Sequence, residues 1–163
     1  LEHGAAVAAD PLQLPFATHS LDLLVLPKCE GAADLIALDR LLASLERGVA
    51  RTTPVGVDAQ IESARGVVGC EAIAVAAARL EALVFGPGDF AATMRMPARA
   101  IGMTDSWDAA YGGDRYHYPQ ARMVTAARAA GVRAIDGPYA DYRDEAGLGT
   151  TASGASTPGR SRW

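Results

Sequence analysis

Short apolar blocks and longer amphipathic stretches alternate along the chain. Residues 22–26 read Asp-Leu-Leu-Val-Leu before Pro27, a block too short and too rich in strand formers for a helix, so they predict a buried strand. After Gly31 the leucines recur at three- and four-residue steps as far as Glu46: Leu35, Leu38, Leu42 and Leu45. This spacing predicts an amphipathic helix, and Gly48 stands where the helix should stop.

The same order recurs farther along the chain. Residues 55–61, entered from Pro54, predict a second strand, and a helix that opens at Gly66 follows it. Four apolar residues of this second helix share one face: Ile73, Ala76, Ala77 and Leu80. Residues 83–85 predict a third strand, which ends at the turn-forming sequence Gly-Pro-Gly of residues 86–88.

A fourth strand is predicted at residues 132–135. The helix before it stops at Gly131 and carries three residues of apolar character: Met123, Val124 and Ala127. Residues 91–113 follow no regular period, so they predict a long loop with room for one helical turn.

Strands that alternate with helices of about ten to fifteen residues are typical of parallel βαβ units, so the fold class is α/β. Four such units are about half of a (β/α)8 TIM barrel, whose full form takes about 250 residues. The periodicity leaves two alternatives, a smaller open sheet or the middle of a barrel with parts missing. We expect this domain to span residues 22–148, after a poorly defined segment 1–21 and before a disordered Gly/Ser/Thr-rich tail, 149–163.

Composition narrows the class of partner. Half of the 163 residues are hydrophobic, enough for the core of one domain, and the formal net charge is −4. That charge offers no basic surface for a phosphate backbone, so nucleic acid is not an expected partner. No apolar run approaches the roughly 20 residues of a membrane helix, so no membrane is expected either. Cys29 and Cys70 lack metal-ligand spacing and predict reduced, buried thiols in a cytoplasmic protein.

Polar residues follow directly after each predicted strand. Two of them, Lys28 and Glu30, follow the first strand, and one acid follows each of the others: Glu62, Asp89 and Asp136. In parallel α/β folds the carboxyl ends of the strands meet at one edge, where catalytic groups gather. We therefore expect these side chains to share one rim of the domain.

Glu62 and Asp89 are the candidate metal ligands. Two carboxylates from neighbouring strand ends, completed by water and substrate oxygens, suit Mg²⁺, because this ion holds its octahedral water shell tightly. The alternative is that Glu62 caps the following helix and Asp89 is a turn or N-cap residue after Gly88. Spacing alone leaves both interpretations open.

Four blocks of sequence occur in an order that resembles a known family: Leu26-Pro27-Lys28, Gln60 to Val67, Leu83 to Phe90, and Ile135 to Tyr139 continuing through Asp144, Glu145 and Gly147. Over roughly residues 22–148 the chain resembles the HpcH/HpaI aldolase and citrate lyase beta-chain family, as part of its TIM barrel. The resemblance implies that Glu62 and Asp89 are catalytic residues that bind Mg²⁺, with Mn²⁺ as the alternative ion.

The resemblance also implies an activity, that of a carbon–carbon lyase. Such an enzyme reversibly cleaves a 3-hydroxyacyl-CoA thioester, such as malyl-CoA, citramalyl-CoA or a citryl thioester, into an acyl thioester and an oxo acid. Segments 113–118 and 121–124 resemble the malyl-CoA lyase branch. Family members form oligomers, so a homo-oligomer is expected. Two alternatives stay open: an aldolase of the same family that acts on free 4-hydroxy-2-oxo acids, and a non-catalytic remnant.

Three further residues are candidate substrate ligands. Lys28 could reach a phosphate or carboxylate from the rim, although a lysine after a strand is commonly just solvated, and Arg65 has the same two interpretations. Asp136 belongs to a block that in the family lines the CoA side of the site. His117, at a helix start, is a candidate base or a structural residue, and the tyrosines on either side of it are expected to pack.

Two parts of the family pattern have no counterpart here. Nothing before Asp22 matches the early strand whose arginine helps to hold the thioester carbonyl, and after Leu148 the tail replaces a Gly-Lys-x-x-Ile-His-Pro block. A parallel barrel buries its strands only when the sheet closes. We therefore expect residues 1–163 alone to show no lyase turnover.

Overall fold

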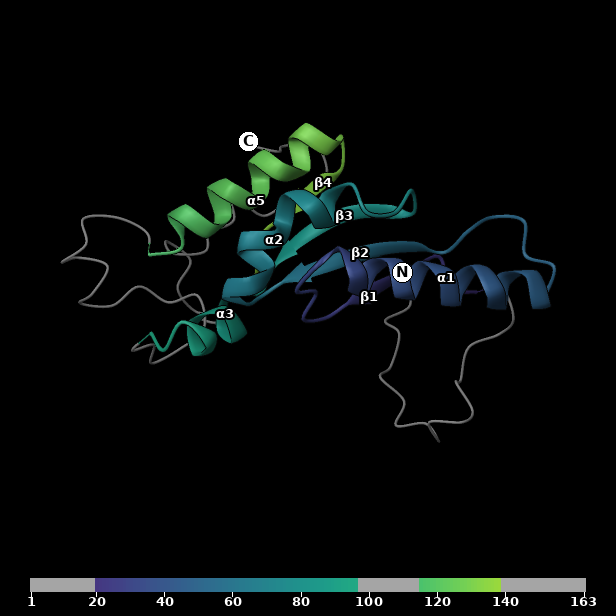
Figure 1. Ribbon diagram of the computed structural model, residues 1–163, viewed down its shortest axis with the longest axis horizontal. Helices are drawn as coiled ribbons and strands as arrows, with labels where there is room; N and C mark the ends of the chain where they lie inside the picture. The colour runs from purple at the N-terminus through teal and green to yellow at the C-terminus, as the bar shows by residue number, and fades with distance from the viewer. Residues whose placement is uncertain (1–19, 97–114, 139–163) are drawn as a thin grey trace.

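The computed structural model describes residues 20–96 and 115–138 (Figure 1). Four parallel strands form one sheet in chain order: β1 (Leu23–Leu26), β2 (Gly56–Ile61), β3 (Leu80–Phe85) and β4 (Arg133–Ile135). The helices are α1 (Ala32–Gly48), α2 (Ala64–Ala74), α3 (Pro87–Thr93) and α5 (His117–Ala130). The predicted α/β class is confirmed. The predicted tail, most of the predicted N-terminal segment and segment 97–114 lie outside the described residues.

Helices α1, α2 and α5 pack on one face of the sheet (Figure 1). Their buried residues form one hydrophobic cluster with alternate residues of β2 and β3: Val57, Ala59 and Ile61, and Leu83 and Phe85. In an open, doubly wound sheet the strand order reverses and helices cover both faces. Within the described residues the order is sequential and these three helices share one face, which is the winding of a barrel.

The alternation of side chains along β2 decides what faces away from the helices. Val57 and its alternate neighbours pack into the helical side, so Asp58 and Gln60 point to the opposite face. Glu62 continues that row just beyond the end of the strand. The polar row of β2 therefore runs along the inner face of the sheet towards its carboxyl edge.

Local hydrogen bonds explain where the helices begin and end. The carboxylate of Asp34 accepts the N–H groups of Glu30 and Gly31 and so caps the start of α1. At the start of α2, the hydroxyl of Ser63 accepts the N–H of Gly66 over 3.0 Å. α5 ends at Gly131, whose φ of 75° lies in the left-handed region that glycine adopts readily. These caps place α1 and α2 directly after the carboxyl ends of β1 and β2.

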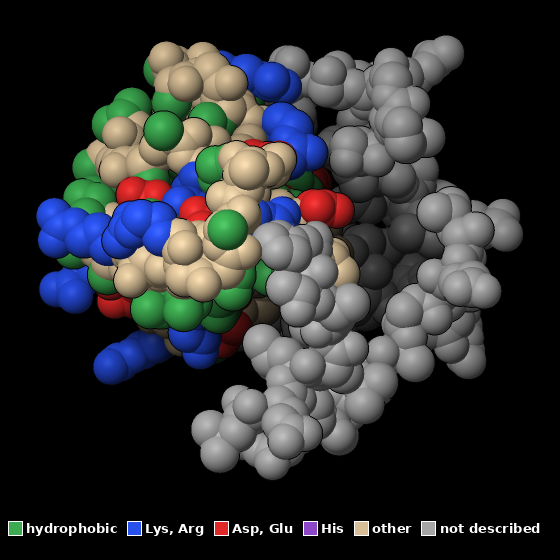
Figure 2. Space-filling model, turned by 90° about the vertical axis from the view of Figure 1, so that its right-hand side faces the viewer, with side chains coloured by type: hydrophobic (Ala, Val, Ile, Leu, Met, Phe, Trp, Pro, Cys, Tyr) green, Lys and Arg blue, Asp and Glu red, His purple; other side chains and the backbone are tan. Residues whose placement is uncertain are grey.

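A buried arginine ties the layers together at the opposite end of the sheet. Arg79, just before β3, donates to both carboxylate oxygens of Glu46 and to Asp39, both on α1, and also to the carbonyl of Val55. The Arg79 and Glu46 side chains are largely buried. Figure 2 views the molecule from the right-hand side of Figure 1, where the strands begin, and shows acidic side chains beside basic ones at its centre.

The predicted second helix was too long. α2 ends at Ala74, and Leu80, predicted on its face, is instead the first residue of β3, opposite Val57. Between them the N–H of Ala76 bonds to the carbonyl of Ile73 and the N–H of Leu80 to the carbonyl of Ala77. Turns with such three-residue bonds have nearly the same spacing of buried positions as a helix, which explains the wrong boundary.

The helix α3 was missed by the sequence analysis. It begins at Pro87 inside the predicted turn and runs into the start of the predicted loop. Proline suits the first position of a helix, because its φ is already helical and its missing N–H has no partner there. Phe90 packs into the core, where its ring centroid lies 5.5 Å from that of Phe85. This contact fixes α3 across the carboxyl end of β3.

Candidate metal and substrate site

Glu62 is the buried acid of the site. It lies immediately after β2 and only 4% of its surface is exposed. Its Oε1 atom accepts the backbone N–H of Lys28 over 2.8 Å. Gly86, after β3, leaves the room for it, since a Cβ there would lie 2.5 Å from the Cβ of Glu62. The carboxylate is therefore held between the ends of β1 and β3.

Asp89 lies in the first turn of α3, beyond the carboxyl end of β3. Its Oδ1 atom lies 3.5 Å from the ammonium nitrogen of Lys28, and about half of its side-chain surface is exposed. The Asp89 carboxylate also raises the pKa of Glu62, as a neighbouring negative charge does. The structure thus brings together three of the predicted site residues, Lys28, Glu62 and Asp89.

The backbone of Lys28 has an unusual conformation. Its φ of 50° lies in the left-handed region, where residues other than glycine lose about 1–2 kcal/mol. In this conformation its N–H meets Glu62 and its side chain meets Asp89. Such local strain is typical of sites where the surrounding contacts dictate the position of a functional side chain.

The electrostatics of Glu62 oppose its ionisation. Burial raises the pKa of this carboxyl group, and the neighbouring Asp89 carboxylate raises it as well, while the N–H of Lys28 lowers it. Two carboxylates repel each other when both are charged, and one of this pair is taken out of water. A bound cation between them would relieve both effects.

The donor set fits a hard divalent cation that keeps part of its water shell. Within residues 20–96 and 115–138, no three His, Cys, Asp or Glu side chains come together as a metal cage. Mg²⁺ does not need such a cage, because water and substrate oxygens complete its shell around one or two carboxylates. Glu62 and Asp89 are the residues that could hold it.

Arg65 and Glu30 form a second, exposed pair on the same rim. An Nη1 atom of Arg65, at the start of α2, lies 3.7 Å from an Oε2 atom of Glu30, and most of the arginine side chain is exposed. Gly66 lets the start of α2 approach the segment after β1, because a Cβ there would lie 2.7 Å from the carbonyl oxygen of Cys29. Arg65 pairs with Glu30 in the structure, but its exposed side chain has room to turn towards a ligand instead.

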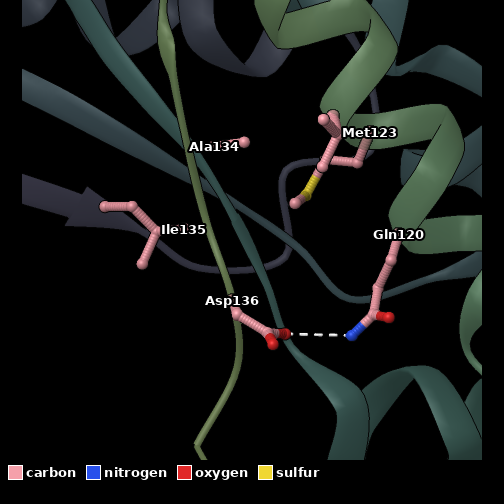
Figure 3. A pocket seen from close by; sticks show the side chains of 6 residues that line it. Gln120, Met123, Ala134, Ile135 and Asp136 are labelled. Carbon is pink, nitrogen blue, oxygen red and sulfur yellow. Dashed lines mark hydrogen bonds between the residues drawn. The ribbon is translucent and has the colours of Figure 1, made fainter. Parts of the chain in front are cut away.

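Asp136 directly follows β4, the strand that pairs with β3. Its Oδ1 atom accepts the side-chain N–H of Gln120 over 2.9 Å, as Figure 3 shows, and the N–H of Gly137. The pocket beside it lies between α5 and β4 and is mostly apolar, with Met123, Val124, Ala134 and Ile135 in its lining. The Asp136 loop packs against the start of α3, because Gly137 lies directly against Pro87.

The other candidate residues have mostly structural surroundings. His117 is exposed at the start of α5. Tyr116 packs edge-on against the ring of Phe85, as predicted, but Tyr118 is exposed and its hydroxyl accepts a hydrogen bond from Arg122, so the packing predicted for it was wrong. Cys29 and Cys70 are buried free thiols, as predicted, and burial raises the pKa of Cys29 to about 11.

Gln60 is a polar residue of this region that the sequence analysis did not single out. Its amide nitrogen lies 3.1 Å from the point where a Cβ of Gly86 would sit, and the Oε2 atom of Glu62 lies 2.6 Å from the same point. The signal was present in the sequence, because Gln60 and Glu62 are two residues apart and so share one face of an extended strand.

A sequentially wound parallel sheet with acidic residues at its carboxyl edge is the arrangement of barrel-type α/β proteins. The family model of HpcH/HpaI aldolase/citrate lyase matches residues 3–159, and the chain belongs to this family. It is 39% identical over 145 residues to the L-malyl-CoA/beta-methylmalyl-CoA lyase of Cereibacter sphaeroides, covering 85% of this chain and 46% of that enzyme. The resemblance noted in the sequence is confirmed.

Solved structures show the same relationship. RipC from Yersinia pestis aligns with a TM-score of 0.62 and 35% identity, covering 80% of this chain and 51% of that one. CitE from Mycobacterium tuberculosis, in complex with magnesium, acetoacetate and coenzyme A, aligns with a TM-score of 0.60 and 27% identity, covering 80% and 41%. The chain spans about half the length of the relatives it matches. In the described part of the chain, no helix is long and apolar enough to cross a membrane.

Proposed function

We propose that this chain belongs to a magnesium-dependent carbon–carbon lyase that reversibly cleaves a 3-hydroxyacyl-CoA thioester into an acyl thioester and an oxo acid. The observation that carries the proposal is the meeting of Glu62 and Asp89 around Lys28 at the carboxyl edge of the sheet. The relative from Cereibacter sphaeroides is named as a lyase of malyl-CoA, and CitE was solved with magnesium and coenzyme A. Malyl-CoA, citramalyl-CoA and citryl thioesters are the proposed substrates.

Cleavage changes the substrate in three steps. The hydroxyl group of the substrate loses its proton and becomes the carbonyl of the oxo acid. The bond between the two carbons breaks, and its electron pair forms the enolate of the thioester, which then takes up a proton to give the acyl thioester. Bound Mg²⁺, or Mn²⁺ in its place, would act as a Lewis acid on the oxo-acid oxygens.

The residues of the chain have separate roles in this proposal. Glu62 and Asp89 hold the ion and thereby orient the oxo-acid end of the substrate. Lys28 offers its ammonium group to a carboxylate of the substrate. Arg65, exposed on the same rim, and Asp136, on the loop beside α3, are proposed to contact the CoA side. The enzyme would act in a homo-oligomer.

Metal binding tests the central pair. Mn²⁺ binding to the purified protein, followed by electron paramagnetic resonance, should weaken on the order of 10- to 100-fold in Glu62→Gln and in Asp89→Asn, because each removes a charged oxygen ligand. Glu30→Gln is the matched control, since it removes an acid from the same rim that pairs with Arg65 instead. Equal affinity in all four proteins would contradict the proposed metal site.

Substrate choice separates the lyase from its alternatives. In the complete protein that contains this chain, we expect Mg²⁺-dependent cleavage of at least one of malyl-, citramalyl- and citryl-CoA. Cleavage of free 4-hydroxy-2-oxo acids without action on these thioesters would identify the aldolase instead. Metal binding without turnover of either class would identify a non-catalytic remnant.

A further inference from the structure

One residue contacts both candidate metal ligands. The backbone N–H of Lys28 bonds to Oε1 of Glu62 over 2.8 Å, and its side-chain nitrogen lies 3.5 Å from Oδ1 of Asp89. The left-handed backbone of Lys28 makes the two contacts compatible, because it turns the chain sharply at the end of β1. The ammonium group of Lys28 thus lies beside the Asp89 oxygen that is a candidate metal ligand.

The contact with Asp89 is weak and easily exchanged. The separation of 3.5 Å exceeds the usual length of a charge-assisted hydrogen bond, and 67% of the Lys28 side chain and 52% of the Asp89 side chain are exposed. Exposed ion pairs of this kind contribute roughly 0–1 kcal/mol. The long, flexible stem of lysine lets the ammonium group leave while the backbone bond to Glu62 stays in place.

We propose, as an extension of the proposed function, that Lys28 is a placeholder cation. It neutralises Asp89 until a divalent ion binds, and the ion displaces the ammonium group. The displaced group then pairs with the carboxylate of the incoming oxo acid. Lys28 therefore opposes the binding of the metal alone and favours the binding of an anionic ligand to the metal-loaded site.

This exchange predicts effects of opposite sign for one substitution. In Lys28→Met, which keeps most of the stem and removes the charge, Mn²⁺ alone should bind about two- to fivefold more tightly, because a competitor worth up to about 1 kcal/mol is gone. Oxalate, a stable mimic of a 2-oxo acid, should bind to the Mn²⁺-loaded variant at least about tenfold more weakly, since a charged partner is lost. A merely structural lysine would weaken both.

Three further variants make the test specific. Lys28→Arg keeps the charge and should leave Mn²⁺ affinity within about twofold of the unaltered protein. Arg47→Met removes an exposed cation from the last turn of α1, away from the site, and should also leave Mn²⁺ affinity within about twofold. Lys28→Gly suits the left-handed backbone, so it provides a second uncharged variant should Lys28→Met fold poorly.

Calorimetric titration of each purified protein with Mn²⁺, and then with oxalate, tests the placeholder role of Lys28. Tighter Mn²⁺ binding together with weaker oxalate binding in the uncharged variants is the expected result. If the unaltered protein binds Mn²⁺ but Lys28→Met and Lys28→Gly bind it equally or more weakly, the placeholder role is wrong and the metal site stands. If the unaltered protein binds no Mn²⁺, the metal site itself is wrong.

Discussion

At the scale of single residues, the position of the Glu62 side chain depends on the glycine beside it, Gly86. Gly86 has no side chain, and Glu62 fills the space that a Cβ would occupy. The atoms in conflict would be the Cβ of Glu62 and its Oε2 atom, at 2.5 and 2.6 Å. Because one of them is next to the backbone, the side chain cannot simply swing aside.

We therefore predict that Gly86→Ala lowers the free energy of unfolding by about 1–3 kcal/mol and weakens Mn²⁺ binding together with it. The control is Gly48→Ala, at the end of α1, where a Cβ would meet no atom within 4 Å and alanine favours the helix. Urea unfolding and Mn²⁺ titration of both variants check this. A Gly86→Ala protein with unchanged metal affinity would show that the position of Glu62 is not set by this glycine.

At the scale of elements, the end of the sheet away from the site is tied by Arg79. Its guanidinium group joins α1, the start of β2 and the segment before β3 through Glu46, Asp39 and Val55. The hydrogen bond from Arg79, and then that from the N–H of Val55, lower the pKa of Glu46 from 4.5 to about 2. The ion pair thereby holds α1 in position against the strands on which the site is built.

This pKa shift makes part of the stability dependent on pH. A carboxyl group whose pKa is lower in the folded state stabilises the protein fully above its ordinary value of 4.5, and the contribution is lost as the pH falls towards about 2. Glu46→Gln should therefore cost about 1 kcal/mol at pH 7 and progressively less between pH 4.5 and 2.

Urea unfolding of Glu46→Gln and the unaltered protein at several pH values measures this difference. The exposed Glu30, substituted as Glu30→Gln, is the control and should change the free energy of unfolding by less than about 0.5 kcal/mol at pH 7. A cost for Glu46→Gln that stays constant down to pH 2 would contradict the assignment.

At the scale of the whole molecule, the sheet has an inner face that α1, α2 and α5 do not cover. Leu23 and Val25 of β1 are partly exposed there, and Val25 stands opposite Asp58 of β2. Asp58 is buried, and its Oδ1 atom has no hydrogen-bond partner but lies 3.6 Å from an Nη2 atom of Arg133. Burial raises the pKa of Asp58, and the charge of Arg133 lowers it. Among the described residues, no strand pairs with the outer edge of β1 or of β4. In a closed barrel such a face and such edges are buried.

We predict that the 163-residue chain self-associates through this face and edge, because exposed apolar strands at a sheet edge pair with other chains. Val25→Lys should raise the dissociation constant at least about tenfold, and the new ammonium group would stand opposite the Asp58 carboxylate. Val75→Lys, at an exposed position at the end of α2, should have little effect. Sedimentation velocity measures both, and a monomeric unaltered chain would contradict the prediction.

The sequence by itself determined the α/β class, the succession of strands and helices along the chain and the acids that follow the strands, since these depend on local periodicity and on motifs a few residues long. It also pointed to Lys28, Glu62 and Asp89, whose grouping follows from the parallel arrangement of the strands. It did not reveal α3 or the true start of β3, because turns and helices share their spacing of buried residues.

Only the tertiary structure decided which of these groups are buried and what they touch. Glu62 is 4% exposed while Asp89, on a helix packed by Phe90, is half exposed, and nothing in either motif distinguishes them. The left-handed turn at Lys28 and the burial of Asp58 beside Arg133 likewise depend on neighbouring strands. Burial and contact are properties of chain segments distant in sequence, so no local pattern could encode them.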